Sequence, residues 1–197
     1  MSRIKKRNTE KMSDSSFKGM TFIFKIVDFL FPYIKNRVKK FNIKKDMIVV
    51  DYGCGPGRYS IPFAKIVGNK GKVYAIDIHE MALEIVNEKK KKYNLNNIET
   101  VKATGNDEGR YYSGLPEGIA DVVCALDMFF VIKKPKEFLD EIRRILKKDG
   151  IFIIDDGHQS RRETKEKLRN SGVFDIFEET KDHLKCKIAK NKNLVKK

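Results

Sequence analysis

The sequence of 197 residues predicts an α/β fold, with a doubly wound, mostly parallel sheet that ends in a C-terminal antiparallel hairpin. Short apolar runs typical of buried strands alternate with longer segments of helical character, which is the pattern of a parallel sheet. The first two of these runs each close on an acid, at Asp51 and Asp77. Two further strand-like runs, 172–179 and 183–189, follow each other near the end of the chain and predict the hairpin.

The first strand is predicted at Met47–Val50, and it leads into a glycine-rich turn. Asp51 closes this strand, and three glycines follow at every second position: Gly53, Gly55 and Gly57. Glycine has no Cβ, so such a loop can adopt positive φ and bring its amides against a ligand. The next segment, 58–67, is helix-like, and the free amides at its start favour a polar or carboxylate-bearing ligand. The alternative is that the three glycines only make a turn.

The second strand, Lys72–Asp77, ends in a carboxylate 24 positions after Gly53. In nucleotide-binding α/β domains, a carboxylate at this distance accepts hydrogen bonds from ribose hydroxyls. A nicotinamide-dependent oxidoreductase is disfavoured, because its G-x-G-x-x-G fingerprint requires a glycine where this chain has Arg58. The two strand ends together predict a site for a nucleoside-containing ligand.

The remaining elements are expected in regular order. Gly68 and Gly71 end the first helix and open the second strand. Apolar residues at helical spacing predict helices at 81–93, 135–146 and 161–170. Apolar or alternating runs predict the third and fourth strands at 98–103 and 121–126. The turn Lys148–Gly150 is expected to lead into the fifth strand, 151–154.

Four stretches resemble, in order, the motifs of class I S-adenosylmethionine-dependent methyltransferases. Asp51–Gly57 is similar to the first motif, and Ala75–Ile78 is similar to the ribose-binding end of the second strand. Ala120–Asp127 is similar to the fourth-strand motif, and Leu139–Ile154 is similar to the helix, turn and fifth strand that follow it. The resemblance runs from about Lys44 to His158. It implies a Rossmann-like methyltransferase fold with a seven-stranded sheet, S-adenosyl-L-methionine as cofactor, and methyl transfer without a covalent protein nucleophile.

The resemblance also implies the residues that bind the cofactor. They lie in the glycine loop and at successive strand ends: Asp51, Tyr52, Gly53, Cys54, Gly55, Gly57, Asp77, Ile78, Asn106, Asp107 and Asp127. The third strand departs from the family pattern, which places an acid directly after it to bind the adenine amino group. This chain has Thr104 there, and its acid arrives three residues later, at Asp107. Asn106 or the backbone is the alternative adenine contact.

The strand-end acids are expected to share one rim of the sheet, because ligands of doubly wound folds lie outside the carboxyl ends of the strands. Asp155 would join Asp51, Asp77 and Asp127 at this rim, and its alternative role is a helix N-cap. His158 follows at the same rim and is the candidate general base, since histidine titrates near neutral pH. Its alternative is a solvated loop histidine. His79 is expected to be solvated or to cap a helix.

The chain before the first strand divides into two parts. Residues 1–16 are polar and basic and are expected to form a flexible arm without a secretory signal. Residues 17–43 form a helical lead or lid, in which twelve of the eighteen residues Phe17–Ile34 are apolar. Charges and Pro32 interrupt the apolar run and argue against a membrane span. Three interpretations stay open: a helix packed on the core, a lid, or a membrane-interface helix.

Charge divides the chain in the same way. Residues 1–46 hold 13 basic and 4 acidic side chains, residues 47–159 hold 17 of each, and residues 160–197 hold 12 and 6. The predicted cofactor domain, 44–190, is thus flanked by a basic lead and a basic tail, 191–197. These flanks suggest weak, nonspecific contact with RNA or an anionic membrane, or simply a solvated lysine-rich surface.

Three isolated cysteines predict neither disulfides nor a metal site and suggest a cytoplasmic protein. The function expected is S-adenosylmethionine-dependent methyl transfer to an unidentified acceptor, which the apolar lead favours as small or apolar. A non-catalytic scaffold that binds S-adenosylmethionine or RNA is the alternative. The sequence does not indicate the oligomeric state.

Overall fold

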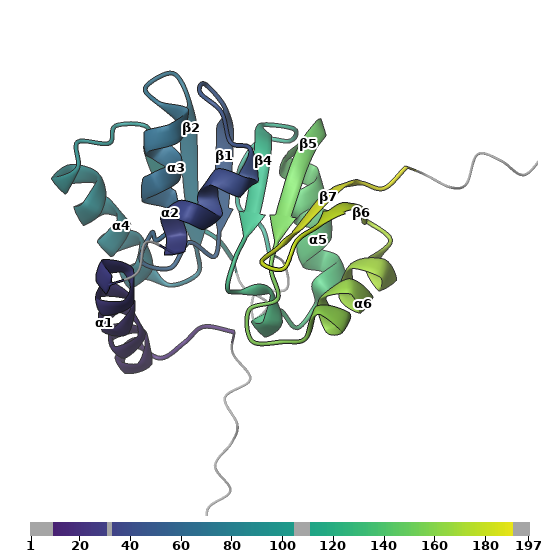
Figure 1. The fold of residues 1–197 in the computed structure, drawn as a ribbon, viewed down its shortest axis with the longest axis horizontal. Helices are drawn as coiled ribbons and strands as arrows, with labels where there is room; N and C mark the ends of the chain where they lie inside the picture. Colours follow the sequence, from purple (N-terminus) through teal and green to yellow (C-terminus); the bar gives the residue numbers. More distant parts are fainter. Residues whose placement is uncertain (1–9, 31–32, 105–110, 191–197) are drawn as a thin grey trace, which may run out of the picture.

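A computed structural model describes residues 10–30, 33–104 and 111–190, and in the helix that ends at Leu30 it describes side chains only up to Phe24. Its centre is one seven-stranded sheet with the strand order β3-β2-β1-β4-β5-β7-β6 (Figure 1). The strands in chain order are β1 (Ile48–Tyr52), β2 (Lys72–Asp77), β3 (Ile98–Lys102), β4 (Ala120–Ala125), β5 (Leu146–Ile154), β6 (Phe174–Glu179) and β7 (Leu184–Ile188).

The sheet has the predicted directions. The first five strands pair in parallel, and β7 pairs antiparallel with both β5 and β6. The last strand is therefore inserted between the fifth and sixth strands. The doubly wound, mostly parallel sheet with a closing hairpin is confirmed.

Helices cover both faces of the sheet. They are α1 (Asp14–Leu30), α2 (Tyr33–Val38), η1 (Lys39–Phe41), α3 (Ser60–Val67), α4 (Glu80–Lys92), η3 (Phe129–Val131), α5 (Pro135–Ile145) and α6 (Arg161–Ser171). Side chains of α2, α3 and α4 join one apolar cluster, and those of α5 and α6 join the other. Val49 belongs to the first cluster and its neighbour Val50 to the second, as strand alternation requires.

The fifth strand begins earlier than predicted. It starts at Leu146, so the expected turn Lys148–Gly150 lies inside β5. Leu146 pairs with Ala120, whereas the next paired residues are Val122 and Ile151. Between these two pairs β5 has three residues more than β4, so the register is irregular there, which explains why a turn-like sequence occurs within the strand. The prediction of a turn was wrong at this place.

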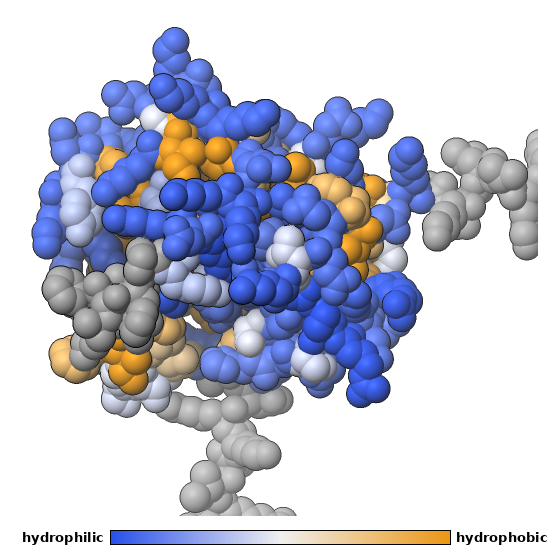
Figure 2. Space-filling view, in the orientation of Figure 1, coloured by the Kyte–Doolittle hydropathy of each residue, from blue (hydrophilic) through white to orange (hydrophobic). Residues whose placement is uncertain are grey.

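The helical lead is only partly buried. Phe17 of α1 is buried, whereas Phe22 and Ile23 are 64% and 58% exposed. Figure 2 shows a largely hydrophilic face with apolar side chains at the α1 end, at the lower left, and further apolar patches at the top and at the right of the view. No helix in the described ranges is long and apolar enough to cross a membrane.

Candidate functional site

The glycine loop and the end of β2 are joined by hydrogen bonds. The amide of Gly55 donates to Oδ2 of Asp77 at 2.8 Å. The amides of Gly53 and Cys54 both donate to the carbonyl of Ile76, at 2.8 and 2.9 Å. The predicted loop and the predicted ribose-binding carboxylate therefore lie side by side at the carboxyl ends of neighbouring parallel strands.

The loop is shaped by glycine at three positions, and each glycine has positive φ: Gly53, Gly55 and Gly57. A Cβ on Gly53 would lie 2.8 Å from Cγ of Met128, and one on Gly57 would lie 2.9 Å from Cγ2 of Val86. A Cβ on Gly55 would meet no described atom within 4 Å beyond its chain neighbours. The outer two glycines are thus closed in by protein, while the middle of the loop is open to a ligand.

Asp77 lies where both of its oxygens accept backbone amides. Oδ2 accepts from Gly55, and Oδ1 accepts from the amide of His79 at 2.8 Å. Burial raises the pKa of Asp77, and these two hydrogen bonds oppose that shift. Each carboxylate oxygen can accept a further hydrogen bond, so this carboxylate is suited to a ligand hydroxyl. Ile78 follows it, partly buried against the apolar core.

Other residues of the first motif, Asp51, Tyr52 and Cys54, are buried. Asp51 is buried, and its Oδ2 accepts a 2.5 Å hydrogen bond from the hydroxyl of Ser60. Burial raises the pKa of Asp51 to about 7. The hydroxyl of Tyr52 donates to the carbonyl of Tyr111 at 2.7 Å, inside the core. The Cys54 thiol is buried and its pKa is raised by burial, so it remains a neutral thiol.

Asp127 stands at the rim directly after β4, as predicted. Its φ is +57°, in the left-handed region, and its side chain is 44% exposed. Guanidinium nitrogens of Arg37 and Arg58 each lie 3.8 Å from its carboxylate oxygens. The hydroxyl of Tyr59 donates to Oδ2 at 3.4 Å. This carboxylate is therefore held by cations on one side and accessible on the other.

Asp155 occupies the same rim but is buried. Its Oδ2 lies 2.5 Å from Nη2 of Arg37, and its Oδ1 accepts the amide of Asp127 at 2.8 Å. Burial raises the pKa of Asp155 to about 6, although Arg37 acts in the opposite direction. The alternative of a helix N-cap is excluded, because α6 is capped by Ser160.

Two of these partners, Arg37 and Tyr59, were missed by sequence reasoning. Arg37 occurs within a basic, lysine-rich lead, where nothing in the local sequence separates it from solvated neighbours. Its guanidinium is buried, and it donates to the Tyr59 hydroxyl as well as to Asp155. The sequence carries no signal for this pairing, because Asp155 is 118 positions away from Arg37.

The two candidate histidines differ in setting. His158 is exposed and packs edge-on against Phe130, with ring centroids 4.8 Å apart. His79 is at the N-cap position of α4, but its ring is buried and stacks on Phe17 at 4.3 Å. Of the two roles expected for His79, a solvated side chain is contradicted because α1 covers the ring, whereas the residue does hold the N-cap position, without a side-chain capping bond. Neither ring nitrogen of His79 hydrogen-bonds to a described residue.

The N-terminal segment reaches across this end of the sheet. Glu10 accepts hydrogen bonds from the Tyr111 hydroxyl at 2.5 Å and from the amide of Lys133 at 2.8 Å. Further along the segment, the Phe24 ring lies 4.0 Å from the Arg58 guanidinium. The segment therefore contacts residues that follow β1 and residues before and after β4. Asn106 and Asp107 lie outside the described residues, so their predicted adenine contact stays a prediction.

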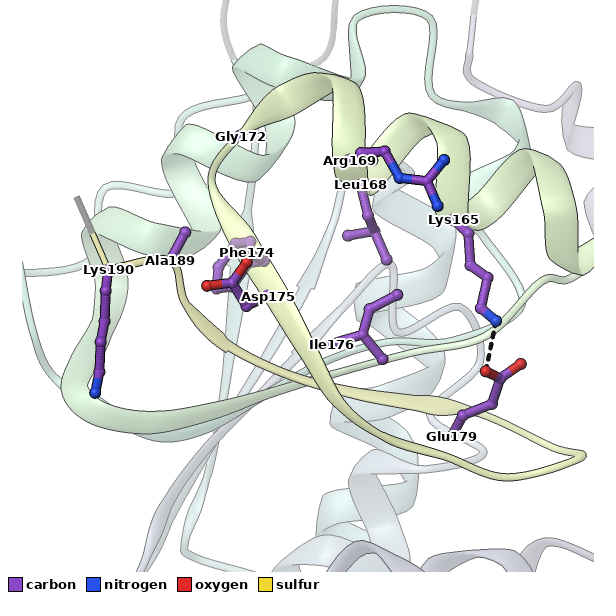
Figure 3. A pocket seen from close by; sticks show the side chains of 10 residues that line it. All are labelled: Lys165, Leu168, Arg169, Gly172, Phe174, Asp175, Ile176, Glu179, Ala189 and Lys190. Atoms are coloured by element: carbon purple, nitrogen blue, oxygen red, sulfur yellow. Dashed lines mark ion pairs between the residues drawn. The ribbon is translucent and has the colours of Figure 1, made fainter. Parts of the chain in front are cut away.

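Two surface hollows occur in the described part of the chain, and one of them borders the glycine loop. One, of about 420 Å³, lies between α1, the end of the glycine loop and α4, where Phe24, Arg58 and Lys89 are among its lining residues. The other, of about 590 Å³, lies between α6 and the β6 edge of the sheet (Figure 3). Its rim is charged, with Lys165 and Glu179 paired at 2.5 Å. Among the described residues, no cluster of His, Cys, Asp or Glu could hold a metal ion.

Comparisons with known proteins agree with this geometry. A family model described as "Methyltransferase domain" matches residues 43–195. A structure described as an S-adenosylmethionine-dependent methyltransferase from Aquifex aeolicus superposes with a TM-score of 0.76 at 25% identity, over 91% of this chain and 100% of that one. A Methanococcus maripaludis structure described as a putative protein of the same kind shares the fold, with a TM-score of 0.72 at 20% identity over 99% and 100% of the two chains.

Curated relatives are similar over part of their length. A probable cobalt-precorrin-6B C(15)-methyltransferase from Saccharolobus solfataricus is 30% identical over 122 residues, which is 60% of this chain and 56% of the relative. A ribosomal protein L11 methyltransferase from Thermoanaerobacter pseudethanolicus is 33% identical over 121 residues, or 61% and 35% of the two chains. The chain thus matches about half or less of each of these relatives.

Proposed function

The chain belongs to the class I S-adenosylmethionine-dependent methyltransferase family, and from this premise we propose that it transfers the methyl group of S-adenosylmethionine to a small or apolar acceptor. The observation that carries the proposal is the contact between Gly55 and Asp77. An open glycine loop and a ribose-binding carboxylate meet there and can hold one nucleoside ligand.

The residues at the rim fit the parts of this cofactor. The Asp77 carboxylate accepts ribose hydroxyls, and the partly buried Ile78 that follows it would pack against the adenine. The Gly53–Gly57 loop, which has open space at Gly55, would lie along the amino-acid part. Asp127, with its accessible carboxylate, binds the α-ammonium group. Asp51 supports the loop from beneath through Ser60 and does not contact the ligand itself.

The bound cofactor supplies a methyl group made electrophilic by its sulfonium. The protein's own task is to align the acceptor with that group and to keep water out. The segment from Glu10 to Phe24 closes this end of the sheet and excludes water. His158 accepts a proton where the acceptor atom carries one.

Two features support a small or apolar acceptor. The covering segment is pinned at Glu10, Phe17 and Phe24, which restricts access to the site. The apolar surface of α1 lies at the same end. The named relatives act on a cobalt-precorrin and on a ribosomal protein, so the family accepts both small molecules and proteins. We propose no role in RNA or membrane binding beyond weak contact through the basic flanks.

The test is calorimetry with S-adenosylhomocysteine, S-adenosylmethionine and NAD. We expect binding of the first two and none of NAD. Incubation of the protein with cell extract and radiolabelled S-adenosylmethionine then identifies the methylated product. Cofactor binding without any labelled product would favour a non-catalytic scaffold, and titration with mixed RNA at two salt concentrations would examine that alternative. NAD binding alone would contradict the proposal.

A further inference from the structure

We infer that Arg37, in the helical lead, is a positioning residue for the cofactor site, and that it fixes Asp127 for the amino-acid end of the cofactor by anchoring Asp155. The inference rests on the proposed function. It assigns part of the site to a segment outside the glycine loop and the strand ends.

Arg37 joins four segments of the chain. It comes from α2, its side chain is only 3% exposed, and Nη2 contacts both Oδ2 of Asp155 at 2.5 Å and the carbonyl of Asp182 at 2.7 Å. Its Nη1 donates to the hydroxyl of Tyr59, just before α3. A buried guanidinium with several fixed acceptors has one orientation, which makes it suitable as an anchor.

Asp155 connects Arg37 to the backbone of Asp127. One carboxylate oxygen of Asp155 is bound by Arg37, and the other accepts the amide of Asp127 at 2.8 Å. Asp127 needs this support because its φ of +57° is unfavourable for a residue with a Cβ. If Arg37 were absent, Asp155 would be a buried carboxylate without its cation and would protonate or turn away. A turned carboxylate would lose the bond to the Asp127 amide, and a protonated one would accept it more weakly than a carboxylate does.

The exposed side of Asp127 determines which part of the cofactor is bound more weakly when Arg37 is replaced. The Asp127 carboxylate has cations on its protein side, at 3.8 Å from Arg37 and from Arg58, and is accessible on the other. It can pair there with a ligand ammonium group. The adenosine part of the cofactor is bound elsewhere, at Asp77. Loss of Arg37 should therefore weaken recognition of the amino-acid group and leave recognition of the nucleoside intact.

The experiment compares two ligands with the full-length chain. S-adenosylhomocysteine carries the amino-acid group, and 5′-methylthioadenosine lacks it. For Arg37→Gln we expect calorimetric affinity for S-adenosylhomocysteine to fall by about tenfold or more, with affinity for 5′-methylthioadenosine unchanged. The matched control is Lys40→Gln, since Lys40 is in the same lead and pairs with Asp182 of the same turn but has no contact with Asp127. We expect this control to bind both ligands as the wild type does.

The possible outcomes distinguish a failure of the role inferred for Arg37 from a failure of the proposed function. Equal losses for both ligands, or no loss, would overturn the positioning role of Arg37 while the wild type still binds S-adenosylhomocysteine. A wild type that binds neither ligand would overturn the proposed function itself. If Arg37→Gln does not fold, as its melting curve would show, Arg37→Lys replaces it: it keeps the charge but loses the forked geometry, and the same selective loss is expected in smaller measure.

Discussion

The amide of Gly55 and the carboxylate of Asp77 are 2.8 Å apart, which makes the middle of the glycine loop and the end of the neighbouring strand one structural unit. The amide is oriented by the same carboxylate that is placed to accept ligand hydroxyls. A change at either residue therefore alters the conformation of the loop and the binding of the ligand together.

The first prediction concerns Asp77→Asn. The amide side chain keeps the shape of Asp77 but loses one acceptor, either for Gly55 or for a ribose hydroxyl. We expect the affinity for S-adenosylhomocysteine to fall about 10- to 100-fold by calorimetry, as for the loss of a charge-assisted hydrogen bond. The melting temperature should also fall modestly, because both oxygens of Asp77 accept backbone amides and the substituted NH2 group cannot accept one of them, so affinity is compared where the variant is fully folded. Glu80→Gln, at the neighbouring exposed acid, is the control. Unchanged affinity in Asp77→Asn would remove Asp77 from the site.

The second prediction compares alanine substitutions at Gly53 and Gly55, which differ in the space around them. Gly53→Ala forces a Cβ to within 2.8 Å of Met128, so it should destabilise the fold by about 1–3 kcal/mol, as measured by urea unfolding. Gly55→Ala has room on the protein side. It should cost less stability but place a methyl group where the ligand lies, and so weaken S-adenosylhomocysteine binding more than it weakens the fold. The reverse order of effects would show that the ligand approaches the loop elsewhere.

Sequence reasoning succeeded where a feature is local. The glycine loop, Asp77 and Asp127 could be located because strand, turn and strand end are adjacent in sequence and their spacing is fixed by the parallel sheet. The ion pair of Arg37 with Asp155 could not, because its partners are 118 positions apart and nothing in the lysine-rich lead marks Arg37 as buried. The irregular register in β5 was missed for another reason, since Lys148–Gly150 has the composition of a turn wherever it occurs.

The third prediction concerns how α1 is attached. The ring of Phe17 stacks on His79, two residues after Asp77, whereas Phe22 on the same helix is exposed. Phe17→Ala should therefore loosen α1 and speed tryptic cleavage after Lys18, and S-adenosylhomocysteine should protect this bond less than in the wild type. Phe22→Ala is the control on the same helix and should be cleaved at the wild-type rate. Equal cleavage rates for both variants would mean that α1 is not held through His79.

The fourth prediction concerns His158. Its exposed ring contacts Phe130 but is not part of the hydrogen-bonded network around Asp127 and Asp155. We expect His158→Ala to lower the rate of methyl transfer about 10²- to 10⁴-fold with an acceptor that must lose a proton, and to leave cofactor affinity unchanged. The assay is single-turnover transfer of radiolabelled methyl once the acceptor is identified. An unaltered rate with such an acceptor would leave His158 as a loop residue.

The last prediction uses the buried carboxyl of Asp51. Burial raises its pKa in the folded protein to about 7, from 3.8. Between these values the folded state holds a proton that the unfolded state has lost, so the stability contributed by this group decreases as the pH rises from about 4 to about 7. Asp51→Asn keeps the shape and the acceptor for Ser60 but cannot ionise. The free energy of unfolding of Asp51→Asn, relative to the wild type, should therefore be larger at pH 8 than at pH 5.

The pKa shift of Asp51, roughly three pH units, limits the change in unfolding free energy to about 4 kcal/mol. Between pH 5 and pH 8 we expect a change of about 1–3 kcal/mol, measured by urea unfolding at the two pH values. His183, whose pKa is lowered to about 4 by burial, titrates in both proteins and cancels in the comparison. Ser60→Ala is the complementary variant. The Ser60 hydroxyl lowers the pKa of Asp51 by its hydrogen bond, so its removal should steepen the loss of stability with pH. A difference between Asp51→Asn and the wild type that is the same at pH 5 and pH 8 would mean that Asp51 is ionised in the folded protein throughout this range.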